Sequence, residues 1–299
     1  MIHFSGSKNP FISLYSYFLG MKIGITIEPY EGIPAGQLVP FARTISLDHI
    51  EINERIIPDI EGVIKNIGKL TTTFHLPIWG VEGYDLGSTK KVNEEKSQKV
   101  ISFINKYHKE LNMLFTLSHP PESPDSEFDV MMDRLQQIDT PIILENIPWQ
   151  ADDIFMDFYF KAKDILGKKL AGHCIDAAHR YLTDWQNWLN VPEKLVKEIV
   201  YVHLQDGTKE EDVHYPLGQG EMPFNDFLHF LKKIGYNGII NQEIKPKGLD
   251  LESIMDSCLL CIKPFSTSRY LRLKAKYAIL RPILRKRIKE AANKRKEPI

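Results

Sequence analysis

Histidine and carboxylate side chains recur along this sequence directly after short apolar runs. The full set is His75, His119, Glu145, Asp176, His203 and Glu243. One histidine in such a place is more often a hydrogen-bonded rim residue than a ligand. Six converging side chains are hard to explain by packing, because each buried carboxylate needs a compensating partner. A bound cation would compensate all of them, so the pattern predicts a metal site.

Two closer pairs extend this set. His179 follows Asp176 by three residues, so one helical turn would bring both to the same side. Asp212 and His214 are two residues apart, and in an extended chain such side chains point the same way. Nitrogen and carboxylate ligands without a thiolate suit Zn²⁺ or Mn²⁺ in a catalytic site. The other histidines are expected to have ordinary structural or surface roles; they are His3, His49, His108, His173 and His229.

Eight short apolar runs alternate with amphipathic stretches, which is the pattern of an α/β fold, the (β/α)8 TIM barrel. The expected strands are Lys22–Ile27, Leu47–Ile52, Thr71–Leu76, Met113–Ser118, Pro141–Glu145, Leu170–Asp176, Ile199–Leu204 and Gly238–Glu243. Catalytic groups of such a barrel stand at the carboxyl ends of its strands, where the six residues lie. An open, doubly wound sheet is the alternative, but the turn after the first strand lacks a glycine-rich phosphate loop.

With these residues in view, the chain resembles the endonuclease IV superfamily (AP endonuclease family 2) of xylose isomerase-like TIM barrels over about residues 21–265. The motifs are Phe-His75-Leu-Pro, Ser-His119-Pro, Leu-Glu145-Asn, Asp176-x-x-His179, Val-His203-Leu-x-Asp206, Asp212-x-His214-x-x-Leu-Gly218-x-Gly220 and Gln-Glu243. The resemblance implies up to three zinc ions. The implied ligands are His75, His119 and Glu145 for the first, Glu145, Asp176, His203 and Glu243 for the second, and His179, Asp212 and His214 for the third.

Two activities follow from this resemblance. Clustered divalent cations favour hydrolysis of a phosphodiester, with Glu145 bridging two of them. Members with a single metal, such as Mn²⁺, isomerise or epimerise sugars with the quartet Glu145, Asp176, His203 and Glu243. In them Glu145 and Glu243 would be catalytic and would move a proton beside a carbonyl. The five additional ligand positions favour the hydrolase, which would act on small phosphodiester or phosphosugar substrates.

DNA is a doubtful substrate for this chain. The loops after the first and fifth strands, Ile27-Glu-Pro-Tyr and Glu145-Asn-Ile-Pro-Trp-Gln, lack the glycine-rich stretches of the DNA-cleaving members. The chain without its last 34 residues also carries a net charge of −11, which offers little attraction for a phosphate backbone. A smaller substrate is at least as plausible, with Trp79, Tyr84 or Trp149 forming a wall of its pocket.

Three segments are expected: an N-terminal extension (1–20), the catalytic barrel (21–265) and a basic tail (266–299). The tail has a net charge of +10, and its apolar residues fall on one face of a helix that Pro282 interrupts or kinks; they are Leu273, Tyr277, Leu280, Leu284 and Ile288. Such a helix suits an anionic membrane or nucleic acid, or packing against the barrel. Three cysteines are too few for a disulfide framework, and no apolar run would span a membrane. We therefore expect a cytoplasmic protein whose tail could attach it to a membrane surface.

Overall fold

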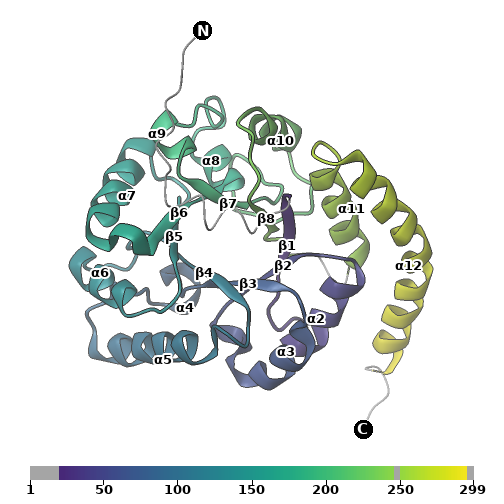
Figure 1. Ribbon diagram of the computed structural model, residues 1–299, viewed down its shortest axis with the longest axis horizontal. Helices are drawn as coiled ribbons and strands as arrows, with labels where there is room; N and C mark the ends of the chain where they lie inside the picture. The colour runs from purple at the N-terminus through teal and green to yellow at the C-terminus, as the bar shows by residue number, and fades with distance from the viewer. Residues whose placement is uncertain (1–19, 246–249, 295–299) are drawn as a thin grey trace.

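The computed structural model describes residues 20–245 and 250–294, with the backbone alone over 287–294. Eight parallel strands pair in sequence order, and β8 returns to β1 to close a barrel (Figure 1). The strands are β1 (Lys22–Thr26), β2 (His49–Ile52), β3 (Thr71–His75), β4 (Met113–Ser118), β5 (Ile142–Glu145), β6 (Leu170–Asp176), β7 (Ile199–His203) and β8 (Ile239–Gln242). The predicted TIM barrel is confirmed, and each strand lies inside its expected run. The extension expected over 1–20 lies outside the described residues, apart from Gly20.

Helices surround this barrel (Figure 1). Those described are α2 (Ala35–Thr44), α3 (Ile60–Ile67), α4 (Trp79–Glu82), α5 (Lys91–Tyr107), α6 (Phe128–Gln136), α7 (Asp152–Leu166), α8 (Ala177–Thr183), α9 (Glu193–Val196), α10 (Phe224–Lys233), α11 (Leu251–Ile262) and α12 (Thr267–Lys294), with short 3₁₀ turns η1 (Glu54–Asp59) and η2 (Gly167–Lys169). The main apolar core lies between the strands and these helices. A smaller apolar cluster lies inside the barrel and includes Phe115, Leu117, Ile143 and Tyr201.

The alternation of side chains along each strand places polar groups inside the barrel. On β3, Phe74 points outwards and packs against Phe103 of α5, with ring centroids 5.8 Å apart. Its neighbours Thr73 and His75 therefore point inwards. On β2, Ile50 and Ile52 belong to the outer core, so Glu51 faces the interior. The strands thus carry polar side chains into the mouth of the barrel while their other face builds the core.

The basic tail forms α12, which runs beside α11 on the outside of the barrel (Figure 1). The helix continues through Pro282 without the interruption that the sequence suggested. The described part of the predicted apolar face packs inwards: Leu273, Tyr277 and Leu284 are buried in the core, Leu280 is partly buried against it, and the Tyr277 hydroxyl donates to the Ile45 carbonyl at 2.8 Å. The side chain of Ile288 lies outside the described residues. That face is therefore engaged with the barrel. Among the described helices, none is long and apolar enough to cross a membrane.

Candidate metal centre

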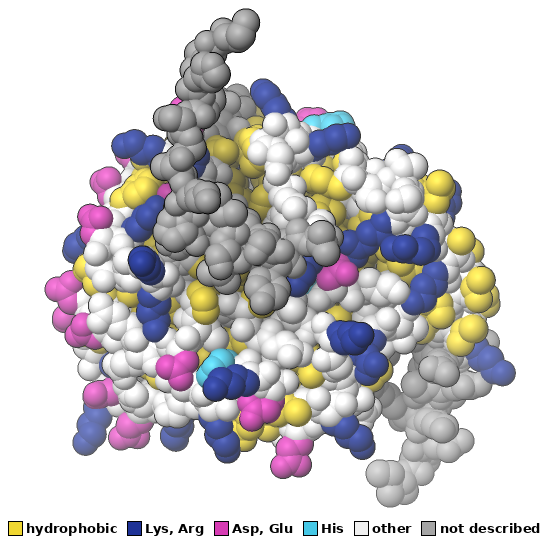
Figure 2. All heavy atoms as spheres, viewed as in Figure 1, with side chains coloured by type: hydrophobic (Ala, Val, Ile, Leu, Met, Phe, Trp, Pro, Cys, Tyr) yellow, Lys and Arg dark blue, Asp and Glu magenta, His cyan; other side chains and the backbone are white. Residues whose placement is uncertain are grey.

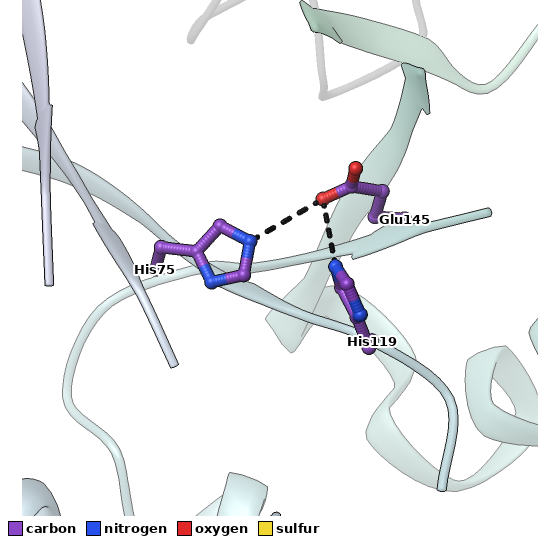
Figure 3. Close-up of side chains that lie close together, drawn as sticks. All are labelled: His75, His119 and Glu145. Atoms are coloured by element: carbon purple, nitrogen blue, oxygen red, sulfur yellow. Dashed lines mark ion pairs between the residues drawn. The ribbon is translucent and has the colours of Figure 1, made fainter. Parts of the chain in front are cut away.

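The first group of candidate ligands is formed by Glu145 and two histidines (Figure 3). Glu145 ends β5 at the barrel axis, and its Oε2 atom lies 3.6 Å from Nε2 of His75 and 3.3 Å from Nε2 of His119. This buried oxygen has no hydrogen-bond partner among the described residues. An unpaired carboxylate oxygen between two ring nitrogens is the environment that a divalent cation would complete.

The second group surrounds Nδ1 of His203, at the end of β7. This atom lies 2.9 Å from Oε1 of Glu145, 3.7 Å from Oδ2 of Asp176 and 3.6 Å from Oε2 of Glu243. Glu145 therefore belongs to both groups, one oxygen facing each. That arrangement fits a carboxylate that bridges two ions, as the resemblance implies.

The third group lies at the rim. Oδ2 of Asp212 is 3.5 Å from Nε2 of His179 and 3.6 Å from Nε2 of His214. His179 comes from the first turn of α8, where Asp176 caps the helix by accepting from the His179 amide at 2.7 Å. The His179 ring also lies 3.5 Å from Glu145 Oε1, so this group adjoins the other two. All nine predicted ligands thus converge at one end of the barrel.

Each of the five histidines is held through one ring nitrogen and presents the other to these carboxylates. Nδ1 is the anchored atom in four of them, bonded to the Leu76 carbonyl (His75), Glu122 (His119), the Asn146 carbonyl (His179) and the Glu243 carbonyl (His214), at 2.6–2.9 Å. Histidines that bind metals almost always have such a partner on the second nitrogen, which fixes the ring and its tautomer. The anchors therefore fit histidines that could bind a metal ion.

His203 is anchored through Nε2 instead of Nδ1. Its partner is a residue that the sequence pattern did not single out. The Nε2 atom of His203 lies 2.7 Å from Oε2 of Glu51, a fully buried residue of β2. Glu51 also accepts from the Tyr201 hydroxyl at 3.0 Å and from the Thr26 hydroxyl at 3.2 Å. The available signal was the alternation His49-Ile-Glu51-Ile, which places a carboxylate on the inner face of β2.

The charges of the cluster compensate one another. Burial alone would lower the pKa of His119, but Glu145 and Glu122 raise it to about 9. The pKa of His179 likewise rises well above its usual value, since Asp176 and Asp212 outweigh burial. Burial opposes ionisation of Glu145, yet His203 and His119 bring the pKa of that carboxyl well below its usual range. Protons on the histidines balance the carboxylates here, and a cation would take their place.

A buried thiol adjoins the cluster, although no thiolate ligand was expected. Cys174 of β6 lies within ligand distance of Glu145 and His203. Burial raises the pKa of this thiol well above its usual value, so it stays neutral. The nine predicted ligands offer nitrogen and carboxylate oxygen, which fit Zn²⁺ or Mn²⁺, and this thiol is a further donor group beside them.

Asp206 organises the loop that carries Asp212 and His214. Its carboxylate accepts from the backbone amides of Gly218 at 2.7 Å and Met222 at 3.1 Å. Gly218 has a φ of +87°, which glycine adopts without strain. A Cβ atom on Gly220 would lie 2.5 Å from the Asp206 carboxylate. The two glycines therefore serve this turn and the close approach to Asp206.

The other histidines and the three proposed wall aromatics lie in different surroundings. His49 is buried on β2, His173 is buried on β6 against Phe155 of α7, His108 is half-buried after α5, His229 is exposed on α10, and His3 lies outside the described residues. Of the three proposed wall aromatics, only Trp149 lines the cavity over the cluster. Tyr84 is buried and donates to Glu54 at 2.7 Å, and Trp79 is exposed and does not line this cavity.

Comparison with known proteins identifies the barrel. A family model described as xylose isomerase-like TIM barrel matches residues 39–260. An uncharacterized protein of Methanocaldococcus jannaschii is 32% identical over 149 residues, 48% of this chain and 51% of the relative. The chain thus spans about half the length of that relative.

Three solved structures share the fold. A D-tagatose 3-epimerase-like protein is 20% identical, with a TM-score of 0.64 over 86% of this chain and 100% of its own. The 3-keto-D-glucoside 4-epimerase YcjR of E. coli is 17% identical, with a TM-score of 0.61 over 81% and 99%. An AP endonuclease, family 2, from Brucella melitensis is 14% identical, with a TM-score of 0.55 over 77% and 94%. At these identities the likeness concerns the fold alone.

Proposed function

This chain belongs to the xylose isomerase-like TIM barrel family, and we propose that it is a metal-dependent hydrolase, with zinc as its metal, of small phosphodiester or phosphosugar substrates. The observation that carries the proposal is the third ligand group, His179, Asp212 and His214, beside the other two. One metal would need only the ligands around His203. Two histidines that meet one carboxylate beside those ligands are a further set of nitrogen and oxygen donors, which is the donor chemistry that suits a zinc ion.

The groups around Glu145, His203 and Asp212 would each hold one ion. When bound, the cations supply an activated water and neutralise the attacking and leaving oxygens. The chain's own residues set the geometry: Glu145 joins two groups, Glu51 orients His203, and Asp206 fixes the loop of the third group. No covalent nucleophile is required of the protein.

The rim of the cavity supports a small substrate over DNA. Glu28 and Glu82 both pair with Arg55, at 3.0 Å and 3.3 Å, and Glu54 and Glu122 also line the cavity. Apart from the histidines, Arg55 and Lys245 are the only basic side chains among the described residues that line the cavity. A rim with this balance offers little to a long phosphate backbone.

The second candidate is a sugar isomerase or epimerase with one metal, such as Mn²⁺. It is favoured by the position of His203 Nδ1, which faces Asp176 and both catalytic candidates, Glu145 and Glu243, within 3.7 Å. One cation held there would bring both glutamates to the substrate, where they would act as acid and base.

Metal content and activity together separate the candidates. We expect close to three zinc ions per chain in protein purified without chelators, and hydrolysis of bis(4-nitrophenyl) phosphate. His214→Ala should lose about one ion and roughly 10–100-fold in activity or more. His229→Ala, an exposed histidine on α10, is the matched control and should change neither. One metal per chain in the parent, unchanged in His214→Ala and accompanied by interconversion of ketoses, would establish the second candidate instead.

A further inference from the structure

We infer that Trp149 is a stacking platform for the substrate, which would then be a phosphodiester carrying a nucleobase or a similar flat aromatic ring. This inference rests on the proposed function and names the substrate class of the same site. Trp149 is 69% exposed, although it lines the cavity of about 590 Å³ that is also lined by His179, Asp212 and His214. A large aromatic left uncovered at the mouth of a ligand-sized cavity is available for a ligand to cover.

The backbone of Trp149 is fixed in an unusual conformation. Its φ is +58°, in the left-handed region that bulky side chains rarely adopt. The amide of Trp149 donates to the Thr183 hydroxyl at 2.8 Å, and this hydroxyl donates to the His179 carbonyl at 2.7 Å. The strained residue is thereby tied to the helix that carries a metal-ligand candidate. Strain that surrounding contacts maintain is a feature of functional sites.

Asn146, in the same loop as Trp149, also forms hydrogen bonds with residues of the candidate metal centre. Its side chain bonds both backbone groups of Asp176, at 2.9 Å and 3.2 Å, and its carbonyl accepts from Nδ1 of His179 at 2.9 Å. None of these anchors uses the indole. Within the described part of the chain, Trp149 has no aromatic or cation–π neighbour, whereas the exposed Trp185 has the Lys209 ammonium 5.6 Å from its ring. These hydrogen bonds anchor the backbone of the loop, while the side chain of Trp149 stays exposed.

Part of the cavity lining suits the face of a flat aromatic group. Pro148, Ile78 and the half-exposed Val81 line the same cavity as Trp149, and their apolar side chains can pack against such a face. Polar residues of the same lining, such as Asn53 and Arg55, could meet the polar edge of that group. A base can stack on an indole, because every base has a π-face.

The test compares two esters with the same leaving group, thymidine 5′-(4-nitrophenyl) phosphate and methyl 4-nitrophenyl phosphate, on the zinc-loaded protein. Trp149→Ala should raise KM for the thymidine ester by roughly 5- to 150-fold, the range of one stacked base, with kcat within a few-fold. The methyl ester should change less than about twofold, and Trp149→Phe should recover part of the loss. Trp185→Ala is the matched control. Equal losses for both esters would overturn the inference.

A binding measurement keeps this inference separate from the proposed activity. Adenosine 3′,5′-cyclic monophosphate should quench the fluorescence of the zinc-loaded parent, and Trp149→Ala should lose that quenching while Trp185→Ala retains it. If the parent hydrolyses neither ester but shows this quenching, the hydrolase proposal fails and the stacking platform stands. If quenching is absent, or a ketose rather than the nucleotide produces it through Trp149, the platform for an aromatic ring is refuted.

Discussion

Replacing Glu51 by glutamine tests whether a buried residue outside the ligand set controls the metal centre. Its carboxylate accepts hydrogen bonds from His203 Nε2 at 2.7 Å, Tyr201 at 3.0 Å and Thr26 at 3.2 Å. Glutamine keeps the shape of the Glu51 side chain but removes its negative charge. Its amide nitrogen, which is itself a donor, would then face groups that donate hydrogen bonds. A hydrogen bond to a charged group contributes about 1.5–3 kcal/mol. Loss of an outer partner of a metal ligand typically weakens binding about 10–100-fold, which is roughly 1.4–2.7 kcal/mol.

We therefore expect Glu51→Gln to raise the zinc dissociation constant about 10–100-fold, measured by competition with a chromophoric chelator. The increase in melting temperature on adding zinc should shrink accordingly, because that increase depends on the dissociation constant. Tyr201→Phe is the control, since it removes a donor to Glu51 but leaves the bond to His203. An affinity within twofold of the parent in Glu51→Gln, or equal losses in both variants, would refute the role of Glu51 in orienting His203.

Four further predictions follow from the same structure. Zinc affinity should rise with pH up to about 9, because raised pKa values such as that of His119 let protons compete with the metal; affinity independent of pH between 6 and 9 would contradict this. Burial lowers the pKa of His173 to about 4, so the unfolded chain takes up a proton near pH 6.5 before the folded one does. Stability should then fall by about 3 kcal/mol between pH 6.5 and 4, and His173→Phe should show a smaller fall in denaturant titrations. Gly220→Ala should displace Asp206 and cost about one metal per chain by elemental analysis, whereas Gly80→Ala, where a Cβ meets nothing within 4 Å, should not. We also propose that the outward face of α12 binds anionic membranes. Leu271, Ile279 and Ile283 are exposed there beside Arg272 and Lys274, and Figure 2 shows basic and apolar side chains together along this edge. Ile279→Ser with Ile283→Ser should reduce sedimentation with anionic vesicles, while Ile154→Ser on α7 should not; an unchanged result would refute this.

Much of the barrel could be read from the sequence because each strand is a short, largely buried run that alternates with a helical pattern. The run Met113–Ser118 coincides with β4, and Leu170–Asp176 coincides with β6. Candidate ligands at strand ends, such as His75 and His203, were accessible to the same reasoning, since the closed barrel brings all these ends to one mouth.

Features that depend on contacts between distant segments were not accessible. Alternation along β2 places Glu51 inside the barrel, but its contact with His203, 152 residues away, could not be read from the sequence. Which face of α12 points towards the barrel could also be learned only from the structure. Its apolar stripe was recognised, but only the burial of Leu273 and Tyr277 shows that this stripe covers the barrel. The exposed apolar residues of the opposite face are too few to stand out in the sequence pattern.

The choice between hydrolase and epimerase rests on the loop from Asp206 to Met222. Glu145, Asp176 and His203 lie on strands that the fold itself fixes, so this part of the site suits either activity. Asp212 and His214 lie on a loop whose shape depends on Asp206 and on a glycine at position 220. Displacing that loop should remove the third ligand group while the strands remain. Gly220→Ala would therefore abolish phosphodiester hydrolysis if three ions are needed, but would leave an epimerase with its single metal and its two glutamates.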